Sequence, residues 1–95
     1  MVTPDASEQR AVHYSGHVQG VGFRYTVRKI AGSHKVTGYV ENLRDGRVHL
    51  VVEGSAGEID RFLAAVRRAL DHYIREARTV SGPASGCFER FEIRY

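Results

Sequence analysis

The stretch GHVQGVGFR, residues 16–24, holds three glycines in nine residues, and the way the chain enters and leaves it decides the fold. Before it, residues 12–16 alternate apolar and polar side chains, which predicts a strand that ends near Gly16. After it, residues 23–31 carry apolar side chains on one face, which predicts a helix of about two turns that stops at Gly32. The stretch is therefore a glycine-rich connection from a strand to a helix, in which the glycines can adopt a positive φ.

Further along the chain, residues 36–42 and 47–53 have the composition and alternation of two strands. Residues 43–46 between them contain an Asp-Gly pair, which predicts a tight hairpin. A second helix follows, because Ser55 precedes Glu58 by three residues in a capping-box pattern. Its apolar stripe recurs at helical spacing, at Ile59, Phe62, Leu63, Val66, Leu70 and Tyr73.

The last third of the chain completes the pattern. A short extra strand fits residues 77–81, a loop fits residues 82–86, and alternation in residues 91–95 predicts the final strand. The order strand, helix, strand, strand, helix, strand predicts an α+β fold, a ferredoxin-like βαββαβ sandwich with an antiparallel sheet and two helices on one face. Residues 10–95 would form this one domain, and residues 1–9, which are polar and aperiodic, are expected to be a flexible N-terminal tail.

Composition limits the class of protein. A chain of 95 residues with 42% apolar content suffices for one modest core. No apolar run is long enough to span a membrane, and residues 1–9 show no secretory signal. The single cysteine, Cys87, excludes an internal disulfide and a thiolate metal cluster. We therefore expect a cytoplasmic monomer that does not act at a membrane.

Positive charge is concentrated in residues 9–40, which contain five Arg or Lys residues and three histidines but no Asp or Glu. An acid-free segment of this length generates a local positive field. Charge alone leaves two interpretations open, a solvated helix face and a binding site for an anion.

The glycine-rich connection favours an anion. Its backbone N–H groups and the N-terminus of the helix converge on one place, and the helix dipole favours negative charge there, phosphate above all. Arg24 lies in the first turn of that helix, where its guanidinium can bind two phosphate oxygens at once. The two common nucleotide fingerprints are absent, since Tyr25 stands where a third glycine would be needed and no Gly-Lys-Ser/Thr occurs.

Residues 16–24 closely resemble the first signature of the acylphosphatase family, Gly-x-Val-Gln-Gly-Val-x-Phe-Arg. A second motif stands at the spacing that the family requires, Gly38-Tyr39-Val40-Glu41-Asn42, and leads through residues 46–48 to Gly54. The resemblance extends over residues 10–95. It departs from the family pattern at Glu41, where a basic or neutral polar residue is usual.

The resemblance implies hydrolysis of acyl phosphates, which are carboxyl–phosphate anhydrides, to a carboxylate and inorganic phosphate, with no cofactor and no metal. Asn42 would orient the attacking water, and Arg24 would bind the phosphate and stabilise charge in the transition state. The carboxylate leaving group needs no general acid, and the proton of the water is expected to go to a phosphate oxygen of the substrate. The phosphate would also be bound by the backbone amides of Gln19, Gly20, Val21, Gly22 and Phe23.

Other functions remain open at this point. A basic ferredoxin-like RNA-binding module would have the same order of elements, but of its aromatic octapeptide only residues 37–40 correspond, and Glu41 follows them. Acylphosphatase-like domains also occur within larger carbamoyl-transfer proteins, and catalytically silent relatives would lack essential side chains. The length of the chain and the presence of both Arg24 and Asn42 lead us to expect a free-standing enzyme.

The remaining residues of chemical interest have simpler interpretations. His13 and His17 make a poor metal pair on a strand and a loop. The other three histidines, at positions 34, 49 and 72, are expected in solvent. The sequence around Cys87 gives no indication of a reactive thiolate, so this cysteine is expected to be buried or idle.

Overall fold

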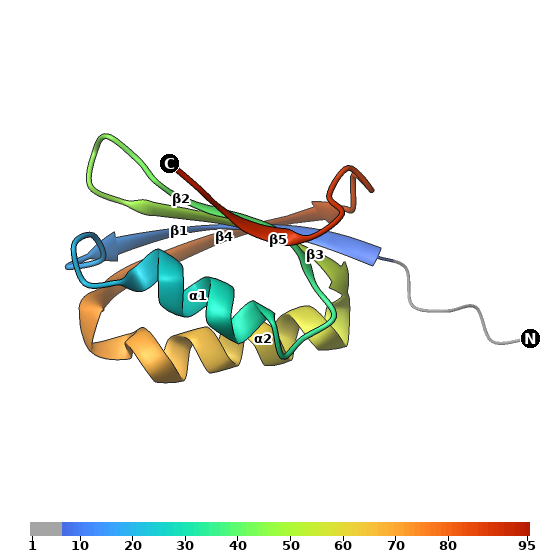
Figure 1. Ribbon diagram of the computed structural model, residues 1–95, viewed down its shortest axis with the longest axis horizontal. Coiled ribbons are helices and arrows are strands. Elements are labelled where there is room, and N and C mark those ends of the chain that lie inside the picture. Colours follow the sequence, from blue (N-terminus) through green and yellow to red (C-terminus); the bar gives the residue numbers. More distant parts are fainter. Residues whose placement is uncertain (1–6) are drawn as a thin grey trace, which may run out of the picture.

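The computed structural model describes residues 7–95, which form one five-stranded sheet in the order β4-β1-β3-β2-β5. Both α-helices cover the same face of this sheet (Figure 1). The helices are α1 (Phe23–Ala31) and α2 (Ala56–Leu70), and a short 3-10 turn, η1 (Asp71–Tyr73), follows α2. The strands are β1 (Ser7–Gly16), β2 (Thr37–Asn42), β3 (Val48–Ser55), β4 (Ile74–Pro83) and β5 (Phe91–Arg94).

The ferredoxin-like α+β fold is confirmed, with one difference in the sheet. Strands β1 and β3, β1 and β4, and β2 and β3 pair antiparallel, as expected. Strand β5 pairs parallel with β2, so the sheet is mixed. The sixth element of the βαββαβ order is β4, in the region where only a short strand was expected, and β5 is the additional strand. Only Ile74 of β4 is buried, and a strand exposed along nearly its whole length shows no apolar alternation in the sequence.

The helices follow the predicted pattern closely. Helix α1 has the predicted bounds, and Gly32 is its C-cap. Helix α2 begins after Ser55, whose Oγ accepts a hydrogen bond from the Glu58 N–H at 3.2 Å. Its stripe packs on the sheet, with Phe62 and three aliphatic residues buried, whereas Tyr73 lies beyond the helix in η1 and is only partly buried. Burial of each large apolar side chain contributes about 1.5–3 kcal/mol.

The N-terminal segment enters the sheet earlier than its composition indicates. Strand β1 begins at Ser7, which pairs with Ser55 of β3, and Glu8 pairs with both Gly54 and Pro83. Residues 7–9 of the expected tail are thus part of a central strand. Residues 1–6, the remainder of that expected tail, lie outside the described residues. Neither α1 nor α2 has the length and apolar character needed to cross a membrane.

Candidate active site

The connection from β1 leads into the N-terminus of α1, and no side chain caps that end of the helix. Gly22, the N-cap of α1, has a φ of 75°, and Gly20 has a φ of 81°, both in the left-handed region. Because no side chain caps the helix and its first turn contains no acidic residue, its first N–H donors remain available. The first helical bond runs from the Thr26 N–H to the Gly22 carbonyl. Free N–H groups at a helix N-terminus favour an anion.

Arg24 is held beside these N–H groups by the end of the chain. Its Nη1 donates to the Arg94 carbonyl at 3.1 Å, and its guanidinium carbon lies 4.9 Å from the centre of the Tyr95 ring. None of the ion pairs within residues 7–95 involves Arg24. A neutral carbonyl and a ring therefore orient the guanidinium without neutralising it, and its other N–H donors remain free.

Asn42, the last residue of β2, lies at the same pocket as Arg24. Its Oδ1 is the one buried side-chain nitrogen or oxygen within residues 7–95 that has no hydrogen-bond partner. Leaving a buried polar atom unpaired costs about 1–3 kcal/mol, so this oxygen does not contribute to stability. Such an atom is typical of a side chain kept for a ligand or a water.

The pocket that joins these groups has a volume of about 200 Å³. That is below the roughly 300–1,000 Å³ of sites for drug-sized ligands, and it suits a small anion. Its lining combines the loop, the guanidinium and the amide with an apolar side, as follows: Val18, Gly20, Gly22, Phe23, Arg24, Tyr25, Asn42, Ile93 and Tyr95.

Comparison with known proteins identifies the family. The family model described as Acylphosphatase matches residues 10–93. The chain belongs to the acylphosphatase family.

Individual acylphosphatases match over nearly their whole length. The protein of Archaeoglobus fulgidus is 38% identical, over 88% of this chain and 94% of its own. That of Syntrophotalea carbinolica is 40% identical, over 88% and 92%. The crystal structure of the acylphosphatase from Bacillus subtilis superposes with a TM-score of 0.83 and 31% identity, covering 93% of this chain and 99% of that one.

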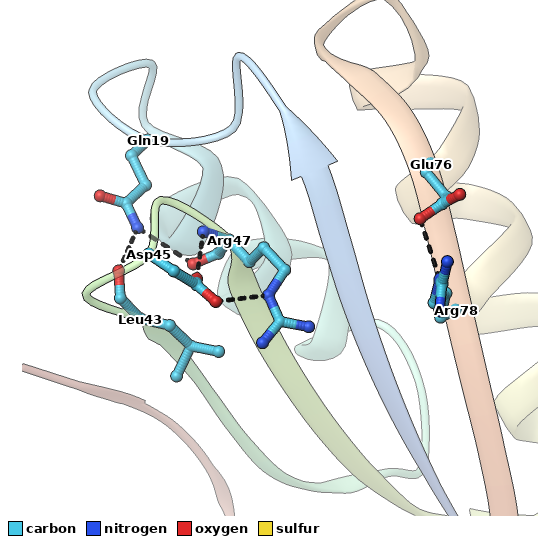
Figure 2. A network of polar contacts seen from close by, with 6 residues as sticks. All are labelled: Gln19, Leu43, Asp45, Arg47, Glu76 and Arg78. Atoms are coloured by element: carbon cyan, nitrogen blue, oxygen red, sulfur yellow. Dashed lines mark hydrogen bonds and ion pairs between the residues drawn. The ribbon is translucent and has the colours of Figure 1, made fainter.

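The structure of this acylphosphatase separates the site residues expected from the two motifs into two groups. Gly20, Gly22 and Phe23 line the pocket with Arg24 and Asn42. Gln19 and Val21 are not among the lining residues. The Gln19 side chain instead points to the β2–β3 turn, where Nε2 donates to the carbonyls of Leu43 and Arg47 (Figure 2).

Four pocket residues were not expected from the sequence: Val18, Tyr25, Ile93 and Tyr95. Val18 and Tyr25 lie within or beside the first motif and could have been included on that ground. Ile93 and Tyr95 reach the site only because β5 pairs with β2, a contact between segments that no local pattern predicts.

Glu41, the departure from the family pattern, does not line the pocket. Its Oε2 lies 3.2 Å from Nδ1 of His49, and the His49 ring stacks on His13 with ring centres 4.4 Å apart. Burial lowers the pKa of His13, and the neighbouring His49 and Arg47 add to this effect. His49 is therefore half-buried and in contact with Glu41 and His13, rather than exposed to solvent as expected. Within residues 7–95, no three His, Cys, Asp or Glu side chains are arranged to hold a metal ion.

Proposed function

We propose that this acylphosphatase hydrolyses the carboxyl–phosphate anhydride of acyl phosphates with Arg24 and the loop amides as its phosphate site and Asn42 as its water-orienting group. One observation carries the proposal. Arg24 from α1 and Asn42 from the end of β2 face the same small pocket, beside the uncapped N-terminus of α1. Side chains on opposite faces of the sheet could not share one phosphoryl group.

Binding and charge stabilisation come from the same groups. The loop amides, with those of the lining residues Gly20, Gly22 and Phe23 nearest the anion, and the guanidinium of Arg24 bind the phosphoryl oxygens, on which charge is spread in the transition state. The Arg94 carbonyl and the Tyr95 ring hold Arg24 in place before the substrate arrives. Little reorganisation is then needed as the reaction proceeds.

In the chemical step, a water oxygen forms a bond to phosphorus while the bond from phosphorus to the carboxyl oxygen breaks. The carboxylate leaves as a stable anion and needs no proton. The proton of the attacking water goes to a phosphoryl oxygen of the substrate, because an amide is too weak a base to take it. The Asn42 amide orients this water, and the place of Asn42 in the pocket lining beside Arg24 supports the role.

We further expect a cytoplasmic monomer that uses no metal or cofactor and releases inorganic phosphate. The one cysteine, which is exposed and free, is consistent with a reducing compartment.

The open face of the sheet does not favour the alternative of an RNA-binding module. Such modules stack bases on exposed aromatic rings of the sheet. Here the guanidinium of Arg94 lies 3.6 Å from the centre of the Tyr39 ring and covers it. Glu41, two residues further along β2 and paired with Arg94, adds a negative charge that would repel RNA. Titration of the protein into single-stranded RNA should therefore show no salt-dependent binding at micromolar concentration.

Hydrolysis of benzoyl phosphate by the purified protein tests the proposal. Arg24→Ala should lower kcat by about 10²-fold or more and weaken inhibition by inorganic phosphate, because it removes charged donors from the phosphate. Arg28→Ala, on the exposed side of the same helix, is the matched control and should change neither. EDTA should leave the rate unchanged.

Asn42→Ala separates the two roles. It should reduce kcat strongly while the inhibition constant of phosphate stays near that of the parent protein, and it should not lower the melting temperature, since the amide oxygen has no partner to lose. Equal losses of turnover and phosphate affinity would show that Asn42 binds phosphate rather than orienting water.

A further inference from the structure

The side chain of Gln19 joins the phosphate loop to the turn that follows Asn42. Its Nε2 lies 2.8 Å from the Leu43 carbonyl and 3.0 Å from the Arg47 carbonyl. One NH₂ group thus uses both of its hydrogens on the two sides of the β2–β3 turn (Figure 2). Leu43 comes directly after Asn42 in the chain, so this contact lies next to the water-orienting amide.

The turn holds its own shape without Gln19. The Leu43 N–H donates to the Arg47 carbonyl at 2.8 Å, and the Gly46 N–H to the Leu43 carbonyl at 3.2 Å. Asp45 accepts two further bonds from Arg47, one from its backbone N–H at 3.1 Å and one from Nε at 2.8 Å. The Gln19 side chain therefore fixes the position of the turn relative to the loop.

We propose that Gln19 is a positioning residue that sets the distance between the phosphate-binding amides and Asn42. The inference rests on the roles proposed above for those groups. The Gln19 side chain itself touches no phosphoryl oxygen, because both of its N–H donors are used by the turn. Its backbone stays in the loop that binds the anion, while its side chain fixes the second half of the site to that loop.

Loss of this link should affect turnover more than binding. Without it, the loop and Arg24 still bind phosphate, but the oriented water is no longer in line with the phosphorus atom. A displacement of about 1 Å at a reacting centre can reduce the rate by about 10²-fold, so a loosened rather than broken geometry should reduce kcat by about 10-fold. Gln19→Met keeps the length of the side chain and removes the donors. Gln19→Glu keeps its shape and places a carboxylate against two carbonyl oxygens, so its loss should be larger.

A double-mutant cycle distinguishes positioning from a merely structural role. The kcat for benzoyl phosphate and the inhibition constant of phosphate are measured for the parent, Gln19→Met, Asn42→Ala and the double variant. Gln19→Met should lower kcat by about 10-fold in the parent and by less than about 2-fold in the Asn42→Ala protein, because there is then no oriented water to misplace. The inhibition constant should change by less than about 3-fold throughout, since the anion site is intact.

The control uses a separate contact that Figure 2 also shows, the exposed pair on β4 in which Arg78 Nε donates to Glu76 at 3.0 Å. Glu76→Gln weakens a polar contact of similar length away from the site and should leave both constants unchanged. Should Gln19→Glu fail to fold, Gln19→Met carries the test, because a neutral, flexible side chain of equal length introduces no repulsion.

Three results would overturn the inference. They are an unchanged kcat in Gln19→Met, an equal fold-loss in both backgrounds, and a loss of phosphate affinity that matches the loss of kcat. A different result separates it from the proposed function. If Asn42→Ala alone keeps full turnover, the water-orienting role of Asn42 is wrong, and the positioning role of Gln19, which depends on it, is wrong as well. If Asn42→Ala is impaired and the two losses multiply, only the role of Gln19 is wrong.

Discussion

Glu41 and Asn42 are neighbours on β2, but their side chains lie in different environments. Asn42 lines the pocket, whereas Glu41 contacts His49 on β3, its direct cross-strand partner. Alternation along a strand sends successive side chains to opposite faces of the sheet. The acidic departure from the family motif therefore leaves the lining of the pocket unchanged.

Replacing Glu41 should accordingly have little effect on the reaction. In Glu41→Gln, kcat and KM for benzoyl phosphate should stay within about 2-fold of the parent at ordinary ionic strength, because Glu41 does not line the pocket and salt weakens the field of a carboxylate that solvent reaches. Steady-state kinetics at low and physiological salt check this. A large gain in phosphate affinity at both salt concentrations would show that Glu41 does act on the anion.

Glu53 should make stability depend on pH. Only 4% of this residue is exposed, and its carboxylate accepts hydrogen bonds from Gln9 Nε2, from the N–H and hydroxyl of Ser85, and from the N–H of Gly86, at 2.7–3.1 Å. Burial alone would raise the pKa of Glu53, but these donors together outweigh it and lower the pKa below its usual value of 4.5. The carboxylate thereby fixes the segment that leads from β4 to β5.

The sign of the effect follows from that lowered pKa. The stabilisation is present above pH 4.5 and is lost as the pH falls through the lower pKa of the folded state. Glu53→Gln should cost about 1–3 kcal/mol at pH 7, because its NH₂ group meets N–H donors. Urea unfolding at pH 7 and pH 3 measures the difference between parent and variant, which should shrink at the lower pH. A constant difference would contradict the prediction.

The sequence predicts those parts of the structure that local patterns determine. Ser55 and Glu58 mark the start of α2, and the two motifs include both Arg24 and Asn42. The bounds of β4 were not predicted, because an edge strand exposed to solvent needs no apolar alternation. Tyr95 was missed for another reason, since its place at the pocket depends on the parallel pairing of β5 with β2, a long-range contact.

Gly38 of the second motif should be required for stability rather than chemistry. Its φ is 138°, and a Cβ at this position would lie 1.9 Å from the Val51 carbonyl oxygen. Gly38→Ala should therefore destabilise the fold by more than about 2 kcal/mol, since backbone of the neighbouring central strand has to move. Gly82→Ala, where a Cβ meets nothing within 4 Å, is the control and should be close to neutral. Similar unfolding midpoints in urea for both variants would refute the assignment.

Tyr95 should affect substrate binding modestly, through Arg24. An exposed cation–π contact contributes about 0.5–1 kcal/mol, which corresponds to a factor of about 2–5. Tyr95→Ala should raise KM and the inhibition constant of phosphate by that factor and leave kcat nearly unchanged, because the Arg94 carbonyl still holds the guanidinium. Tyr95→Phe keeps the ring and should behave as the parent does. If Tyr95→Phe proved as impaired as Tyr95→Ala, the hydroxyl rather than the ring face would be the part of Tyr95 that matters.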